Sequence, residues 1–163
     1  MMRLARKLLL AAAAMAALVL LAAQLGAFSG TAPDNLGMRD GKLRAPSKTP
    51  NSVSSQADLW PQHPMQDYAR IAPLALRGSG PETIARIRRI VEAMPGAKVV
   101  QARDDYLYVQ FTTRWMKFVD DAEFWFDPAA NVIQVRSASR VGRKDFGVNR
   151  ARIDAIRQAL AAG

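Results

Sequence analysis

The first 28 residues constrain the chain most, because they are too apolar for a water-exposed surface. An unbroken run without a polar side chain, Leu8 to Ala23, follows three basic residues, Arg3, Arg6 and Lys7. As a helix, residues 8–28 would be about 31 Å long, which matches a hydrocarbon core of about 30 Å. A buried helix of a small domain does not need to be apolar on every face. The segment therefore predicts a membrane anchor or an export signal.

Residues 1–28 are open to both interpretations, and we favour the retained anchor. In the alternative, Ala27-Phe28-Ser29 offers small residues at the two positions that signal cleavage requires. Basic residues before the apolar run, and uncharged residues directly after it, place the N-terminus in the cytoplasm. Both interpretations therefore put the rest of the chain outside the cytoplasm.

The chain is basic, with 23 Lys and Arg against 14 Asp and Glu and a formal net charge of +9. Basic surfaces attract nucleic acid, anionic lipid or acidic polymers, and export makes nucleic acid the least expected of these. The chain has no cysteine and one histidine, His63. This excludes disulfides, thiol catalysis and thiolate or multi-histidine metal sites, so we expect neither a metal nor a cofactor.

The composition divides the rest of the chain into a linker, residues 29–50, and a domain, residues 51–163. The linker is rich in Pro, Ser, Asn and Gly, and it continues into an extended N-terminal arm of the domain. Residues 68–76 are apolar enough for a short strand, which Pro73 restricts to a sheet edge.

Two helices and four strands are expected in the domain. Ser79-Gly-Pro-Glu82 has the spacing of a capping box, and apolar residues then recur at three and four until Pro95-Gly96. A second helix starts between Gly147 and Arg150 and ends near Ala161. Four strand-like runs with short connections lie between the helices, at residues 97–102, 105–113, 118–127 and 132–141.

The register of the strands can be derived from their loops. Four-residue loops at 114–117 and 128–131 place Glu123 opposite both Tyr108 and Arg136. Both hairpins then put the same apolar set on one face, which includes Leu107, Phe124 and Val135. We predict an α+β fold, a four-stranded antiparallel meander with both helices on that apolar face.

The opposite face carries aromatic and charged residues. One cross-strand row is Tyr108, Glu123 and Arg136, and the next is Gln101, Tyr106, Trp125 and Gln134; Asp121 and Arg140 lie nearby. Aromatic rings beside arginines can bind sugars or anionic ligands. In the alternative, Glu123 and Arg136 form an ordinary cross-strand ion pair and residues 52–76 cover the rings.

Residues 136–150 form a polar strand-to-helix junction, where arginines near a helix N-terminus favour an anion. In the alternative, Asp145 or Asn149 caps the helix and the arginines pair with Asp120 and Asp121. Asp121 and Glu123 share a face, so they could also act as the carboxylate pair of a hydrolase of envelope material.

Several motifs, in order and spacing, resemble the domain-of-unknown-function family 1499 over residues 34–161. They lie at residues 35–41, 50–56, 118–124 and 136–150. The resemblance implies a small bacterial envelope protein, with relatives in plastids and no established activity. The family often has a cysteine where this chain has Ser52, so a redox or metal role does not carry over.

The leading hypothesis is a non-catalytic module at the bacterial inner membrane, facing the periplasm, or secreted to the periplasm after signal cleavage. Its partner would be an anionic lipid, a glycan or an envelope protein. A structural or assembly role in a membrane complex is a further alternative. The candidate ligand-binding residues are Tyr108, Asp121, Glu123, Trp125, Arg136, Arg140, Asn149 and Arg150.

Overall fold

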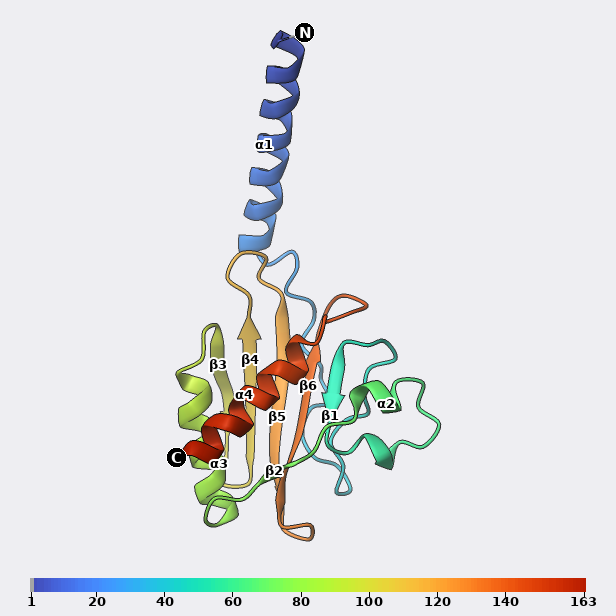
Figure 1. The fold of residues 1–163 in the computed structure, drawn as a ribbon, viewed down its shortest axis with the longest axis vertical. Coiled ribbons are helices and arrows are strands. Elements are labelled where there is room, and N and C mark those ends of the chain that lie inside the picture. Colours follow the sequence, from blue (N-terminus) through green and yellow to red (C-terminus); the bar gives the residue numbers. More distant parts are fainter. Residues whose placement is uncertain (1) are drawn as a thin grey trace.

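The computed structural model describes residues 2–163 (Figure 1). Helix α1 (Met2–Gln24) projects away from the remaining elements, which form an α+β domain built on one antiparallel sheet. Residues 2–24 are long and apolar enough to cross a membrane. Because signal sequences share these properties, α1 is compatible with a membrane anchor or a signal sequence.

The helix α1 ends earlier than the apolar composition indicates. Gly26 adopts φ +87°, and the N–H groups of Gly26 and Ala27 donate to the carbonyls of Ala23 and Ala22 at 2.9 and 3.0 Å. This is the Schellman arrangement, in which glycine takes the left-handed conformation that ends a helix. The expected apolar helix to Phe28 is therefore wrong by four residues, because Gly26 stops it.

The sheet contains six strands, so the predicted four-stranded sheet was too small. Strands β3 (Ala97–Ala102), β4 (Tyr106–Thr112), β5 (Val119–Asp127) and β6 (Val132–Ser139) pair antiparallel in sequence order. Strands β1 (Ser52–Ser54) and β2 (Leu74–Ala75) both add to the other edge of β6. At two and three residues, these strands are too short to show a sequence period.

The registers of the two central hairpins are confirmed. Glu123 lies opposite Tyr108 on one side and Arg136 on the other. The outer strand departs from the prediction, because the β3–β4 register shifts between Val99 and Gln101. This irregularity places Gln101 opposite Tyr108 rather than Tyr106, since an extra residue in one strand displaces all later pairs.

Helices α3 (Gly80–Glu92) and α4 (Val148–Ala162) cover one face of the sheet, as expected (Figure 1). The capping box of α3 is present, with Ser79 N–H donating to Glu82 Oε2 at 2.7 Å and Ser79 Oγ accepting from Glu82 N–H. The main core lies between these helices and the sheet and includes Ile87, Val91, Leu107, Phe124, Val135, Ile153 and Ile156.

The opposite face is buried under residues 36–45. Leu43 packs on Tyr106, Tyr108 and Trp125, with the half-buried Leu36 beside them. The expected cover by residues 52–76 was wrong, because β1 and β2 use this stretch to extend the sheet beyond β6. The short helices η1 (Ala57–Leu59) and α2 (Gln66–Ala69) accordingly lie out beside β1 (Figure 1).

Candidate functional site

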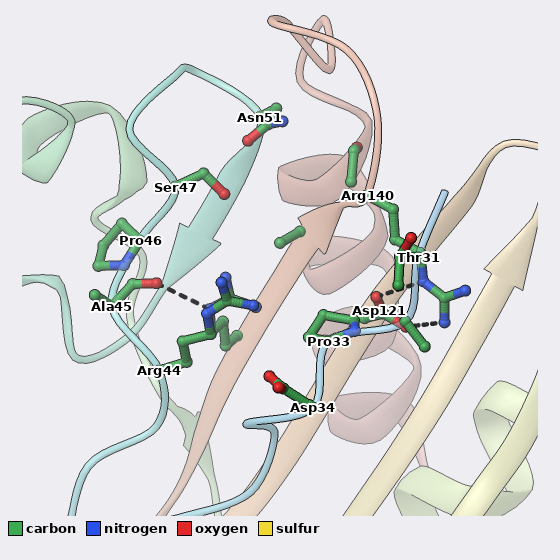
Figure 2. Close-up of a pocket in the computed structure, with 14 residues that line it drawn as sticks. Thr31, Pro33, Asp34, Arg44, Ala45, Pro46, Ser47, Asn51, Asp121 and Arg140 are labelled. Atoms are coloured by element: carbon green, nitrogen blue, oxygen red, sulfur yellow. Dashed lines mark hydrogen bonds and ion pairs between the residues drawn. The ribbon is translucent and has the colours of Figure 1, made fainter. Parts of the chain in front are cut away.

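A cavity of about 490 Å³ lies on the face opposite the helices, between strands β5 and β6 and the N-terminal segment. Figure 2 shows its two walls, one carrying Thr31, Pro33 and Asp34 and the other carrying Arg44 to Ser47. The sheet contributes Asp121, Arg136, Ala138 and Ser139, and Arg140 follows directly after β6. Three of the predicted binding residues, Asp121, Arg136 and Arg140, therefore line one cavity.

Arg136 is 3% exposed and lines the cavity. Burial lowers its pKa, and the nearby Arg44 adds to this effect while Glu123 opposes it. Its Nε donates to the carbonyl of Ala45 at 3.3 Å, and its Nη1 lies 3.8 Å from Glu123 Oε2. A guanidinium has five N–H groups, and no other acceptor within residues 2–163 bonds to this one. Arg136 is thus buried and short of hydrogen-bond partners.

Glu123 lies fully buried beneath Arg136 and does not line the cavity. Its Oε1 accepts hydrogen bonds from Tyr106 Oη at 2.8 Å and from Gly37 N–H at 2.6 Å. Its Oε2 has no hydrogen-bond partner in residues 2–163 and faces Arg136 as an ion pair. Burial and the adjacent carboxylate raise the pKa of Tyr106. The predicted cross-strand pair is present, but its geometry leaves donors of Arg136 free.

Asp121 and Arg140 form a separate, bidentate pair. Arg140 Nε donates to Asp121 Oδ2 at 2.8 Å and Nη2 donates to Oδ1 at 2.7 Å (Figure 2). Tyr108 Oη also donates to Asp121; burial and this hydrogen bond raise the pKa of Tyr108. Hydrogen bonding to Asp121 raises the pKa of Arg140. Arg140 is therefore largely satisfied within the protein, in contrast to Arg136.

The two carboxylates have different arginine partners, and this geometry counts against the hydrolase alternative. Asp121 is held by Arg140, and Glu123 is held by Arg136, Tyr106 and Gly37. An acid–base pair needs a carboxyl group that reaches the substrate and exchanges a proton with it. Glu123 has no exposed surface, so it cannot take this part.

The remaining predicted residues lie away from the cavity lining. Trp125 packs in the cluster with Leu43. Asn149 is buried at the start of α4, where its Nδ2 donates to Ser139 Oγ at 3.1 Å. Arg150 donates to the carbonyls of Tyr68 and Arg70 at 2.6 and 3.0 Å. Asn149 and Arg150 thus join α4 to its neighbours.

The N-cap residue of α4 is Gly147, so the expected cap by Asp145 or Asn149 was wrong in position, although Asp145 still bonds to the start of the helix. The carboxylate of Asp145 accepts from the N–H groups of Gly147, the N-cap, and Asn149, in the first turn, at 3.1 and 3.2 Å. Burial raises the pKa of Asp145, but hydrogen bonds from Tyr68, Asn149 and Gly147 outweigh this effect and lower it. The second carboxylate of the junction, Asp120, pairs with Arg152 rather than with a residue of the 136–150 run.

The cavity residues that sequence reasoning missed include Asp34, Arg44 and Asn51. Asn51 is 6% exposed; its Nδ2 donates to the Gly142 carbonyl at 2.8 Å, and its buried Oδ1 has no partner in residues 2–163. Asn51 belongs to the 50–56 motif that carried the family resemblance, which was the one available signal. Asp34 and Arg44 lie in a polar stretch without periodicity, where nothing marked them.

The lining combines donors and acceptors of defined chemistry. Arg136 offers guanidinium N–H groups, Arg44 adds a second positive charge, and Asn51 Oδ1 is a free hydrogen-bond acceptor within residues 2–163. Such a set suits an anionic group that is joined to a hydroxyl or amino group. No group of three or more acidic or histidine side chains within residues 2–163 could hold a metal ion.

These features define a class: a small α+β domain with a cavity lined by three arginines and two aspartates, joined to a single apolar helix. The family described as "Protein of unknown function (DUF1499)" matches residues 42–160, and the chain belongs to this family. The family predicted from the motifs is thereby confirmed. No curated protein and no solved structure matches the chain.

Proposed function

We propose that the chain is a non-catalytic module, tethered to a membrane by α1, that binds an anionic ligand in the cavity. Arg136 carries this proposal, because it is buried, lines the cavity and has N–H groups without a protein acceptor. The unpaired Nη groups are not sealed inside the protein, so a ligand in the cavity can reach them. A bound carboxylate or phosphate would supply the missing acceptors in the planar geometry that guanidinium groups favour.

The ligand carries a hydrogen-bond donor as well as an anionic group. Asn51 Oδ1 is a buried acceptor without a partner, and its amide orientation is fixed by the Nδ2 bond to Gly142. A ligand with a hydroxyl beside a phosphate or carboxylate offers a donor for Asn51 and acceptors for Arg136. Glycerol phosphate and acidic sugars have this chemistry.

The bacterial inner membrane, with the domain in the periplasm, is the proposed location. Arg3, Arg6 and Lys7 precede α1, and the next charged residue after the apolar run is Asp34. This asymmetry supports an N-terminus in the cytoplasm and a domain on the other side. In the periplasm, anionic lipid head groups and envelope glycans would be sources of such a ligand.

The proposal is tested by titrating the full chain, in detergent micelles, with glycerol phosphate, glucuronate and inorganic phosphate. Calorimetry should detect saturable binding of at least one probe. Arg44→Ala should weaken it by about tenfold, because one ligand-facing charge is lost. Arg136→Lys, which keeps the charge beside Glu123 but removes the guanidinium fork, should also weaken it.

Arg39→Ala is the matched control, since Arg39 is an exposed arginine of the same segment that does not line this cavity. Its affinity should equal that of the unmodified chain. Equal losses in Arg39→Ala and Arg44→Ala would reveal unspecific attraction to a basic surface. Absence of saturable binding for all three probes would overturn the proposal.

A further inference from the structure

The connection between β4 and β5 meets the end of α1 (Figure 1). Gln24 Nε2 donates to the carbonyl of Trp115 at 2.9 Å, and the ring of Phe28 lies 5.9 Å from that of Phe118, centroid to centroid. The two contacts come from different ends of the connection. They hold the loop beside the helix where the apolar run ends.

This loop exposes aromatic rings that a water-facing surface would bury. Trp115 is 62% exposed and Phe118 is 38% exposed, and Leu25 beside them is 80% exposed. The guanidinium of Arg114 lies 4.9 Å from the ring of Trp115, and Lys117 follows two residues later. Tryptophan with adjacent Arg and Lys is the combination that favours the boundary between head groups and acyl chains.

The length of the apolar run within α1 brings this loop toward that boundary. The apolar run Leu8 to Ala23 measures about 24 Å as a helix, which is shorter than a hydrocarbon core of about 30 Å. A short span draws its flanking residues toward the membrane. The flanking residues here are Gln24 and Phe28, and the loop that contacts both of them is drawn toward the membrane as well.

We propose that residues 113–118 form a second membrane contact beside α1. Trp115 and Phe118 enter the interfacial layer of the leaflet in which α1 ends, and Arg114 and Lys117 bind lipid phosphates. The contact holds the domain in one orientation on the bilayer. This inference rests on the tether of the proposed function and does not depend on a ligand in the cavity.

The test uses the full chain reconstituted in vesicles of phosphatidylcholine and phosphatidylglycerol, with part of the lipid brominated near the head groups. The emission of Trp115 is obtained as the difference between the unmodified chain and Trp115→Phe. We expect brominated lipid to quench this difference emission and soluble acrylamide to leave it largely unchanged. Trp60 and Trp125 are present in both proteins, so their emission is removed by the subtraction.

Arg114→Glu should reduce quenching by brominated lipid, because a carboxylate is repelled by the anionic surface. Arg103→Glu is the matched control: Arg103 is an exposed arginine over a ring, that of Tyr106, at the other end of β4. It should leave the quenching unchanged.

Two failures are distinguishable by flotation of the vesicles. A chain that floats with the vesicles, but whose Trp115 emission is quenched by acrylamide and not by brominated lipid, would overturn this inference and leave the tether standing. A chain that does not float would overturn the tether, and the inference with it. Equal effects of Arg114→Glu and Arg103→Glu would overturn the specific contact with lipid phosphates.

Discussion

The two faces of the sheet are both buried, but by different interactions. Under the helices, Leu107 and Phe124 are inaccessible to solvent and surrounded by apolar side chains. Under the N-terminal segment, the buried groups include two ion pairs, Glu123–Arg136 and Asp121–Arg140. The stability of the first face depends on how well apolar side chains fill its volume. The stability of the second face depends on each buried charge being paired with its partner.

This difference distinguishes the helix-covered face, which acts as the scaffold, from the opposite face, which holds the candidate site. Burying a charge is costly unless it is paired and hydrogen-bonded, so a poorly bonded ion pair adds little to stability. Asp121 and Arg140 meet this condition with two short hydrogen bonds, whereas Glu123 and Arg136 are 3.8 Å apart. The incomplete pair is the one whose guanidinium lines the cavity.

The largest effect should follow from removing one member of the incomplete pair. Arg136→Met leaves the buried carboxylate of Glu123 without a counter-charge, and this should lower the free energy of unfolding by about 3–5 kcal/mol. Adding Glu123→Gln should restore much of the loss, because the amide oxygen still accepts from Tyr106 and Gly37. Urea titration followed by circular dichroism measures both. A double variant no more stable than Arg136→Met would contradict the dependence on pairing.

On the helix-covered face, volume rather than polarity should decide stability. Leu107→Ala should lower the free energy of unfolding by about 2–5 kcal/mol, since it removes buried methyl groups and leaves a cavity. Leu107→Met, which keeps the volume, should cost less than about 1.5 kcal/mol. The same urea titration compares the two variants. Similar losses for Ala and Met would show that shape, not volume, limits this core.

Acid should weaken the junction between α4 and the sheet. Asp145 has a lowered pKa in the folded chain, against an unfolded value of about 3.9. Its stabilising effect is therefore present above about pH 4 and is lost as the pH falls through the folded pKa. Asp145→Asn should lower the free energy of unfolding by about 1.5–3 kcal/mol at neutral pH, through weaker hydrogen bonds.

The pH profile supplies the check on this assignment. Unfolding free energies between about pH 6 and pH 2 should fall less steeply for Asp145→Asn than for the unmodified chain, because the titrating group is gone. Parallel profiles would assign the acid sensitivity to other carboxylates.

The smallest effect is expected at the start of α3, outside both faces. Ser79→Ala removes the hydrogen bonds that Ser79 Oγ makes with Glu82, while the backbone N–H bond to Glu82 Oε2 remains, and should cost about 1 kcal/mol. Arg88→Ala, in the exposed pair with Glu92 on the same helix, should cost only about 0.3–0.5 kcal/mol. Melting curves of the two variants should therefore separate, and coincident curves would argue against the cap.

Local patterns predicted much of the apolar side of the domain. Two loops of four residues were enough to pair Glu123 with Tyr108 and Arg136, because antiparallel strands alternate faces with a period of two. The capping box at Ser79 was readable for a similar reason, since it involves residues three apart. Gly26 could have shown that α1 ends before Phe28, but hydropathy alone hides this signal.

Contacts between distant segments were outside the reach of such patterns. Gly37 lies 86 residues from Glu123 and still donates to it, and Ala45 lies 91 residues from Arg136. The side chains of Gly37 and Ala45 do not predict these hydrogen bonds, because each residue contributes a backbone group. The hydrogen bond from Gln24 to Trp115 was equally hidden, because its acceptor is the backbone carbonyl of Trp115.

The sequence by itself determined the apolar N-terminal helix, the order of the main strands and the face that the two helices cover. These properties follow from hydrophobic periodicity and from turns, which are local. The tertiary structure alone decided what covers the other face, which charge is left under-bonded and which loop meets the end of α1. Those outcomes depend on hydrogen bonds to backbone groups and on contacts between segments far apart in the sequence. A polar segment without periodicity has no local pattern that would predict such contacts.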